Sequence, residues 1–326
     1  MDELDEAVLN RVQAAREEFL ARLEPVRPDL HRYCRRLTGD VWDAEDLVQE
    51  TLTRALARAG QTFQAVANPR AWLFRIATNA YVDTWRRPAP VPADLPDRAA
   101  ATPADPMEVR DALRDLHTLL PPQERAAVVL ADAFELPNAE IADMLGTTVG
   151  AVKSALHRGR ARLADRPADP AKPPRPADPV SPRRPAPDRA LVEALAEAFT
   201  AYDLDRVAAL FLDNGVSEIV GMVQEQGRDR ARAGTLHGAL VGETRVRFRA
   251  EVRDLDGEPV VLLWEAPTDD SAPEAVGNVL RVEQSGGRIA RLRWYFFCPE
   301  TVAEVAERFG VPAITHGYSG PGCAAH

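Results

Sequence analysis

The chain has 326 residues, of which 45% are hydrophobic and 28% charged, a soluble globular composition with room for two or three compact domains. No apolar run is long enough to cross a bilayer, and the acidic amino terminus lacks the features of a secretory signal, so we expect a cytoplasmic protein without a membrane partner. The net charge of −10 disfavours a simple DNA binder, but basic residues gather in 70–87 and 153–166 and acidic ones in 2–18 and 40–50, which suits contact with both DNA and a basic protein.

The three cysteines give no sign of a metal site. Cys34, Cys298 and Cys323 lie far apart and show no CxxC spacing, so we expect neither a disulfide framework nor a zinc site, and no metal or cofactor.

Proline-rich segments divide the chain. Two of them break helix so often that they are interpreted as extended linkers. The resulting division is residues 1–87, a linker over 88–105, residues 106–165, a linker over 166–188, residues 189–300, and a tail over 301–326.

The first block is predicted to be all helix. A helix over 27–37 stops near Gly39, a second over 43–59 stops near Gly60, and a third starts at Asn68–Pro69 and runs to about residue 87. The second of these helices has one acidic face, with Leu52 and Leu56 on the opposite side. The face consists of Asp43, Asp46, Gln49 and Glu50. Such a face on a DNA-binding protein would contact something other than phosphate, although a charge run is ordinarily only solvated.

The third helix mixes cations with aromatic rings. Its basic residues are Arg70, Arg75, Arg86 and Arg87, and its aromatic residues are Trp72, Phe74, Tyr81 and Trp85. Cations that follow a backbone and rings that stack on unpaired bases are what capture of single-stranded DNA requires. Some of these rings must instead belong to the core, and Trp72 is the first candidate for that role.

The second block has the pattern of a helix-turn-helix. A helix over 107–120 ends at two prolines, another covers 123–134, and a short one follows Asn138, a suitable N-cap. Ala142 suits a close helix crossing, Gly146 supplies the turn, and a longer basic helix follows. That helix carries Thr147 and Thr148 at its start and then Lys153, His157, Arg158, Arg160 and Arg162. The alternative is a plain helical hairpin with a solvated basic face.

In the third block the spacing of apolar residues changes from the period of a helix to that of a strand. Two helical segments, 190–202 and 205–212, precede residues 244–253, in which apolar and polar side chains alternate as in a half-buried strand. Asp256–Gly257 is a hairpin signal, 260–264 continues as a buried strand, and 276–283 pairs with 289–297. Helices followed by an antiparallel sheet predict an α+β domain.

The helical blocks resemble a known family. Residues 120–163 (LPPQERAAVVLADAFELPNAEIADMLGTTVGAVKSALHRGRARL) resemble region 4 of the extracytoplasmic-function sigma factors, which reads the promoter −35 element. Residues 43–59 (DAEDLVQETLTRALARA) resemble region 2.2, and residues 68–87 (NPRAWLFRIATNAYVDTWRR) resemble regions 2.3 and 2.4. Ala155 departs from the family, which often has Arg there. The resemblance implies two all-α modules, a region 2 bundle and a region 4 helix-turn-helix.

The resemblance also implies partners and site residues. The acidic face of Asp43, Asp46, Gln49 and Glu50 is assigned to RNA polymerase core, where its partner is the basic clamp coiled coil of the β-prime subunit. The β flap is a further expected contact of the chain with core. The −10 element is assigned to Arg75, Asn79, Asp83, Trp85, Arg86 and Arg87. The −35 element is assigned to Thr147, Thr148, Lys153, His157, Arg158, Arg160 and Arg162. Promoter DNA is therefore the second expected partner, and a separate anti-sigma protein would be a third.

The last block resembles SnoaL-like domains of the NTF2-like superfamily, a curved sheet wrapped by helices into a cone. The likeness rests on residues 190–216 (ALVEALAEAFTAYDLDRVAALFLDNGV) and implies a regulatory domain that could take a small ligand. Candidate pocket residues are His237, Glu265, Arg293 and Tyr295, although packing or surface roles suit them better because no paired carboxylate or triad spacing is present. A helix near the carboxyl end has an apolar stripe of Val302, Val305, Ala306 and Phe309 that must pack on the cone or on the helical modules.

Three functions remain open at this stage. The leading hypothesis is a sigma factor, without catalysis of its own, whose fused domain regulates it. The second is a small-molecule enzyme or ligand sensor, with the cone domain active and the helical half a tether. The third is an ordinary repressor that binds duplex DNA without polymerase.

Overall fold

The structure is a computed structural model that describes residues 6–61, 66–86, 116–117, 119–165, 185–242, 247–266 and 273–318. Its contacts divide the chain into two compact units, residues 1–90 with 106–181 and residues 91–105 with 182–326. Within the described ranges, no helix is both long and apolar enough to span a membrane. The first linker, residues 166–184 of the second and most of the helix expected over 107–120 lie outside the described residues.

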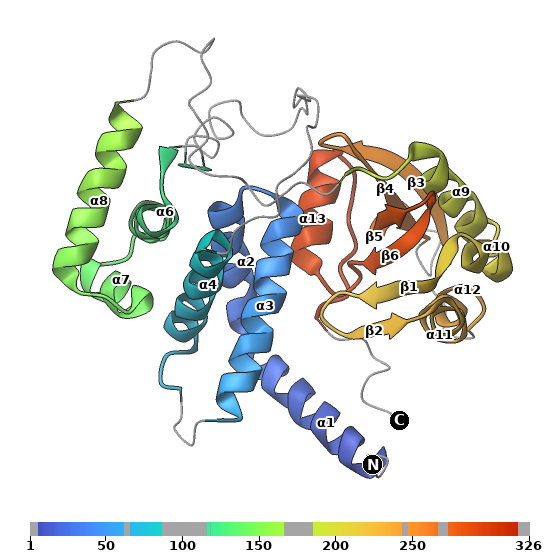
Figure 1. The fold of residues 1–326 in the computed structure, drawn as a ribbon, viewed down its shortest axis with the longest axis horizontal. Coiled ribbons are helices and arrows are strands. Elements are labelled where there is room, and N and C mark those ends of the chain that lie inside the picture. Colours follow the sequence, from blue (N-terminus) through green and yellow to red (C-terminus); the bar gives the residue numbers. More distant parts are fainter. Residues whose placement is uncertain are drawn as a thin grey trace. The chain divides into compact units, whose positions relative to one another are not determined.

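The first unit begins with a bundle of helices (Figure 1), made of α1 (Glu6–Leu23), η1 (Glu24–Val26), α2 (Arg27–Thr38), α3 (Val41–Ala59) and α4 (Pro69–Arg86). Their ends follow local signals. Gly39 terminates α2 in the left-handed conformation, with a φ of 75°. The Asp40 carboxylate accepts hydrogen bonds from the amides of Trp42 and Asp43 and so caps α3. Asn68 caps α4 in the same way, through the amide of Ala71.

The same unit continues with α6 (Pro122–Val128), the π-helical turn η2 (Val129–Ala133), α7 (Asn138–Leu145) and α8 (Val149–Ala164). Gly146 forms the left-handed turn between α7 and α8, as expected, and Thr148 caps α8 through the amide of Ala151. Asn138 does not have the expected capping role. It is the first helical residue, Pro137 occupies the cap position, and no side chain caps α7.

One hydrophobic core runs through both sets of helices of this unit. Tyr33 stacks on Phe74 with ring centroids 4.6 Å apart, and Phe134 meets both rings edge-on. Arg125 of α6 is 1% exposed, and its guanidinium donates to the Leu37 carbonyl of α2 and to Tyr81 Oη of α4. The other donors of Arg125 bind the carbonyls of Leu116, His117 and Leu120. A buried guanidinium thus joins α6 to α2 and α4 through satisfied hydrogen bonds.

The second unit is the expected α+β domain. Its helices are α9 (Arg189–Thr200), α10 (Leu204–Ala209), α11 (Arg228–Ala231), η3 (Arg232–Leu236), α12 (His237–Leu240) and α13 (Pro299–Arg308). Its strands are β1 (Phe211–Ile219), β2 (Val223–Gln226), β3 (Phe248–Leu255), β4 (Glu258–Glu265), β5 (Ala275–Ser285) and β6 (Arg288–Trp294). They form one sheet in the order β2-β1-β6-β5-β4-β3.

Sequence reasoning missed part of this domain. The segment expected to be helical over 205–212 stops at Ala209, and Phe211 already begins β1. The sheet is mixed, because β1 pairs with β6 in parallel while all other neighbouring strands of the sheet pair antiparallel. Alternation of apolar residues is weak in β1, and a pairing across some 75 positions leaves no local signal.

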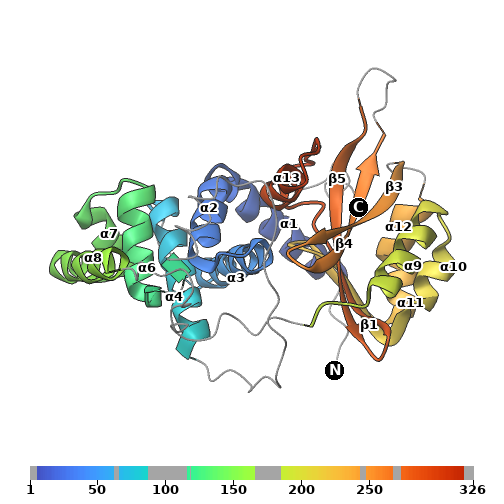
Figure 2. The same cartoon turned by 90° about the horizontal axis from the view of Figure 1, so that it is seen from above.

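The two faces of the sheet have different covers. Figure 2 shows α9 to α12 on one side of the sheet and α13 on the other. On the first side, which we call the inner face, Val261, Leu263 and Trp294 belong to a core shared with α9. On the outer face α13 packs against β5 through its expected apolar stripe, with Val302, Val305 and Ala306 buried.

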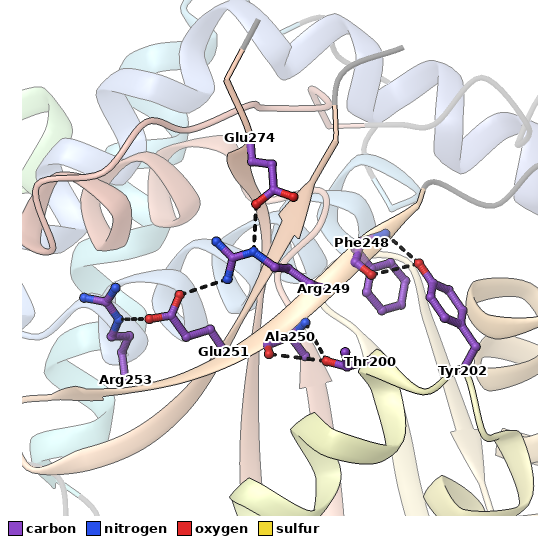
Figure 3. A network of polar contacts seen from close by, with 8 residues as sticks. All are labelled: Thr200, Tyr202, Phe248, Arg249, Ala250, Glu251, Arg253 and Glu274. Carbon is purple, nitrogen blue, oxygen red and sulfur yellow. Dashed lines mark hydrogen bonds and ion pairs between the residues drawn. The ribbon is translucent and has the colours of Figure 1, made fainter. Parts of the chain in front are cut away.

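Side-chain hydroxyls close the free edge of the sheet (Figure 3). Tyr202 Oη accepts a hydrogen bond from the Phe248 amide at 2.7 Å and donates to the Phe248 carbonyl at 2.8 Å. Thr200 Oγ1 makes the same pair of bonds with Ala250, at 3.1 and 3.4 Å. The hydroxyls therefore occupy edge groups of β3 that another strand would otherwise pair with.

Candidate nucleic-acid interface

The start of α8 is the most open part of the helix-turn-helix. Thr147, Thr148 and Val149 are exposed, and Val149 has 40% of its surface accessible. Val152, Leu156 and Gly159 are buried on the opposite side of α8. A Cβ atom at Gly159 would lie 2.9 Å from Val128, so α8 crosses α6 too closely for a larger residue. This packing presents the first turns of α8 outward, as a recognition helix requires.

The cations of α8 fall into two groups. The Glu124 carboxylate of α6 is only 8% exposed; it accepts a hydrogen bond from Arg158 Nε at 2.9 Å and pairs with Arg162. Arg160 pairs with Asp132 of η2. Lys153 and His157 are exposed and form no ion pair among the described residues. The structure therefore separates three arginines that are paired with carboxylates from an exposed lysine and an exposed histidine, a distinction that residue spacing did not reveal.

On α4 the polar candidates share one stripe. Arg75 and Asn79 are exposed, and Asp83 follows one turn later, paired with Arg54 of α3 at 3.2 Å. The Arg75 guanidinium lies against the turn at Gly146, where an added Cβ would meet Nη2 at 2.9 Å. The side chains of Trp85 and Arg86, and all of Arg87, lie outside the described residues.

The aromatic residues of α4 are mostly structural. Phe74 is 0% exposed and Tyr81 is 5% exposed, so neither ring is open to a base. Trp72, which we expected to be the first core residue, is only partly buried against the core. Trp72 therefore packs against the core as expected, but Phe74 and Tyr81 are the aromatic residues of α4 that are buried in it.

The acidic face of α3 is partly accessible. Glu50 is exposed and pairs with Arg54 at 2.7 Å, while Asp43 and Asp46 are half-buried. Gln49 donates to Glu45, a buried carboxylate whose Oε2 lies 3.9 Å from His31 Nε2. Leu52 is buried, as expected for the inward side of α3.

The four pocket candidates of the second unit do not form one site. His237 is exposed on α12, and Arg293 projects from the outer face, where it binds Glu218 at 3.2 Å. Tyr295 is fully buried after β6, with its amide on the Val279 carbonyl. Glu265 is 5% exposed at the end of β4, and its partner is His316 of the tail. No sequence signal connects two residues 51 positions apart.

Family models match three segments of the chain. Sigma-70 region 2 matches residues 23–89, and Sigma-70, region 4 matches residues 110–163. A SnoaL-like domain matches residues 192–292. The described helices and the mixed sheet of the second unit agree with this order of two helical modules followed by an α+β domain. The segments define a sigma-70-type protein with a fused SnoaL-like domain.

Curated relatives identify the family more closely. The RNA polymerase sigma-E factor of Streptomyces avermitilis is 35% identical over 154 residues, which are 45% of this chain and 84% of that protein. The ECF RNA polymerase sigma factor SigG of Mycobacterium tuberculosis is 35% identical over 243 residues, 63% of this chain and 62% of SigG. This chain thus spans less than two thirds of the length of SigG. The chain belongs to the extracytoplasmic-function (ECF) family of RNA polymerase sigma factors.

Among solved structures, the crystal structure of the extracytoplasmic-function sigma factor SigJ of Mycobacterium tuberculosis is similar to this chain. It is 22% identical, covers 84% of this chain and 95% of its own, and has a TM-score of 0.30. That score is too low for a common arrangement of the domains to be inferred.

Proposed function

We propose that the chain directs RNA polymerase core to specific promoters as an alternative sigma factor. The observation that supports this most is the exposed start of α8, where Thr148, Lys153 and His157 are exposed on a close-packed helix-turn-helix. In this fold the first turns of the second helix contact base edges in the major groove. The exposed stripe of Arg75 and Asn79 on α4 then serves the −10 element, while Phe74 and Tyr81 support the helix from the core.

The acidic face of α3 is the proposed contact with polymerase core. Asp46 and Glu50 lie one turn apart on this face, in a protein whose other exposed helix carries cations for DNA. A basic coiled coil, as in the β-prime clamp, is the complementary partner. Oppositely charged surfaces steer association and fix its register.

Reversal of this acidic face tests the assignment. Asp46→Arg with Glu50→Arg is expected to abolish binding to polymerase core without unfolding the chain. Glu50 is exposed, where substitutions change stability by less than about 0.5 kcal/mol, and Asp46 is half-buried outside the hydrophobic core, so circular dichroism and thermal unfolding must first show that the variant is folded. Glu193→Arg with Glu197→Arg on α9 is the matched control, since it has the same charge change and the same spacing. Core binding is measured by pull-down and by promoter-specific transcription. A folded Asp46/Glu50 variant that binds core as well as the control does would refute the assignment.

We further propose that the SnoaL-like domain regulates promoter engagement. The linker over 166–188 is proline-rich and long enough to let a tethered domain return to the helical unit at high effective concentration. A chain truncated after Asp165 should change transcription from the cognate promoter in a reconstituted assay, and one truncated after Phe297 should change it partly. Two truncated chains that transcribe like the full chain at every salt concentration would instead favour an independent enzyme or sensor.

A further inference from the structure

A buried carboxylate lies at one end of the inner face of the sheet. Glu265 has the same parity on β4 as the core residues Val261 and Leu263, so it points to the inner face. The register of β4 and β5 shifts at this point, because Gly277 is an extra residue between the pairs Leu263–Asn278 and Trp264–Val276. A Cβ at Gly277 would lie 1.9 Å from Glu265 Oε1. The bulge and the glycine together make the space that the carboxylate occupies.

The partner of this carboxylate comes from the carboxyl tail. His316 Nε2 lies 3.0 and 2.9 Å from the two oxygens of Glu265. The imidazole stacks on Phe296, with ring centroids 4.1 Å apart and planes 9° from parallel. The tail is joined to β5 by two backbone hydrogen bonds, which link Val276 to Pro312 and Ile314. A planar nitrogen ring is therefore bound edge-on by a carboxylate and face-on by an aromatic ring.

A second polar group beside the carboxylate has no partner. Asn278 is 3% exposed, and its Oδ1 accepts no hydrogen bond within the described structure. It projects from the inner face directly opposite Leu263, next to the bulge that holds Glu265. An unpaired buried acceptor costs free energy, so a donor at this position would be favourable. Glu265, Asn278 Oδ1 and the face of Phe296 all attract N–H groups or positive charge.

We propose that these residues, which we call the Glu265 site, form a binding site for a small planar nitrogen base in its cationic form, and that His316 occupies it as a tethered ligand. A buried carboxylate is costly without a partner, so the site is held either by the tail or by a free cation of the same shape. Apart from His316, the tail is held in the described structure by the two backbone bonds to Val276 and by a hydrogen bond from Tyr318 Oη to Glu300, few enough for local opening to let it exchange with such a ligand. The site is independent of the promoter-binding function.

Imidazole is the probe that tests this site in the full chain. In His316→Gly the tethered ring is removed, and imidazole is expected to bind saturably, as measured by calorimetry and by a rise in the thermal midpoint. In wild-type chain the tail competes at millimolar effective concentration, so apparent affinity should be lower. Pyrazole has the same size but is not protonated at neutral pH, and it should bind His316→Gly at least about tenfold more weakly because it lacks the charge-assisted bond.

The double variant Glu265→Gln with His316→Gly should lose imidazole binding by a similar factor. Absence of imidazole binding to a folded His316→Gly chain would overturn the proposal, as would equal affinity for imidazole and pyrazole. Equal imidazole binding by the single and double variants would overturn it as well. Should the double variant not fold, the comparison of imidazole with pyrazole on the single variant decides the question.

Discussion

At the scale of single residues, Glu124 decides how much of the positive charge of α8 is available. Its carboxylate is nearly buried and holds Arg158 and Arg162, which flank the close crossing at Gly159. Charge-assisted hydrogen bonds to a desolvated carboxylate are stronger than exposed ion pairs. We therefore expect Arg158 and Arg162 to stabilise the crossing of α8 with α6 first, and to contact DNA only secondarily. Glu124 thus positions α8, and in the proposed function it would limit the nonspecific attraction of this helix to phosphate.

Replacement of this carboxylate should therefore change the salt dependence of DNA binding. In Glu124→Gln two arginines lose their partner and can contact phosphate, so nonspecific DNA affinity should rise and the slope of log K against log salt should steepen by up to about two. Asp132→Asn, which releases only the exposed Arg160, is the control and should change the slope by about one or less. Titrations of the full chain with nonspecific duplex measure both slopes. Unchanged slopes in both variants would show that the arginines contact phosphate equally well from their paired positions.

His117 makes the first unit sensitive to acid. Burial, with the nearby Arg125 and Arg35, lowers the pKa of His117 from 6.5 to about 3. Between those values the unfolded chain binds a proton that the folded chain does not. The free energy of unfolding should therefore fall as pH decreases from 6.5 towards 3, by at most about 1.4 kcal/mol per pH unit from this group. His117→Gln should flatten this part of the stability curve, measured by denaturant unfolding at several pH values; an unchanged slope would contradict it.

At the scale of elements, α8 carries side chains with two different functions. Lys153→Ala should weaken promoter binding by the holoenzyme by roughly 1 to 3 kcal/mol if it reads a base edge. Arg158→Ala should have a smaller effect on promoter affinity and a larger one on stability, because it leaves Glu124 with one partner fewer. Promoter titrations and thermal unfolding of the two variants separate the functions. Equal losses of affinity with equal stability would show that both residues contact DNA alike.

The edge strand β3 shows how an element is protected from unwanted pairing. Tyr202→Phe removes the hydroxyl that bonds both backbone groups of Phe248, and Thr200→Val removes the equivalent hydroxyl at Ala250. The double variant should lose about 1 to 3 kcal/mol per unsatisfied group that stays buried, and should self-associate more readily. Light scattering at increasing concentration measures the association. A fully monomeric double variant would show that the hydroxyls do not protect the edge.

At the scale of the whole molecule, the first unit holds its two helical modules together. Arg125 joins α6 to α2 and α4, and Arg75 of α4 lies against the turn at Gly146. In the proposed promoter complex, the −10 and −35 elements are separate sites along the duplex, which rises about 3.4 Å per base pair. One chain that occupies both elements must therefore separate α4 from α7.

This separation is measurable with spin labels. Labels at Asn79→Cys on α4 and His157→Cys on α8, in a chain whose native cysteines are replaced, should be close in the free protein and tens of ångströms farther apart in the promoter complex. A label pair within one module, at Asn79 and Thr53 of α3, should keep its distance and serves as the control. A free chain in which the two labels are already as far apart as in the promoter complex would contradict the packing of α6 against α2 and α4 through Arg125.

The sequence by itself determined most of the helices of the first unit and the change of class after the second linker. The Asn68 cap, the glycine turns and the apolar periodicity act over three or four positions, so they can be interpreted without the fold. The tertiary structure alone decided which charged groups pair across long stretches of the chain. Glu124 faces Arg158 across 34 positions and Glu265 faces His316 across 51, and the parallel pairing of β1 with β6 is equally remote. Such contacts depend on which elements pack against each other in the folded chain. Desolvation and hydrogen bonding then select partners that are close in space, and these partners show no periodic pattern in the sequence.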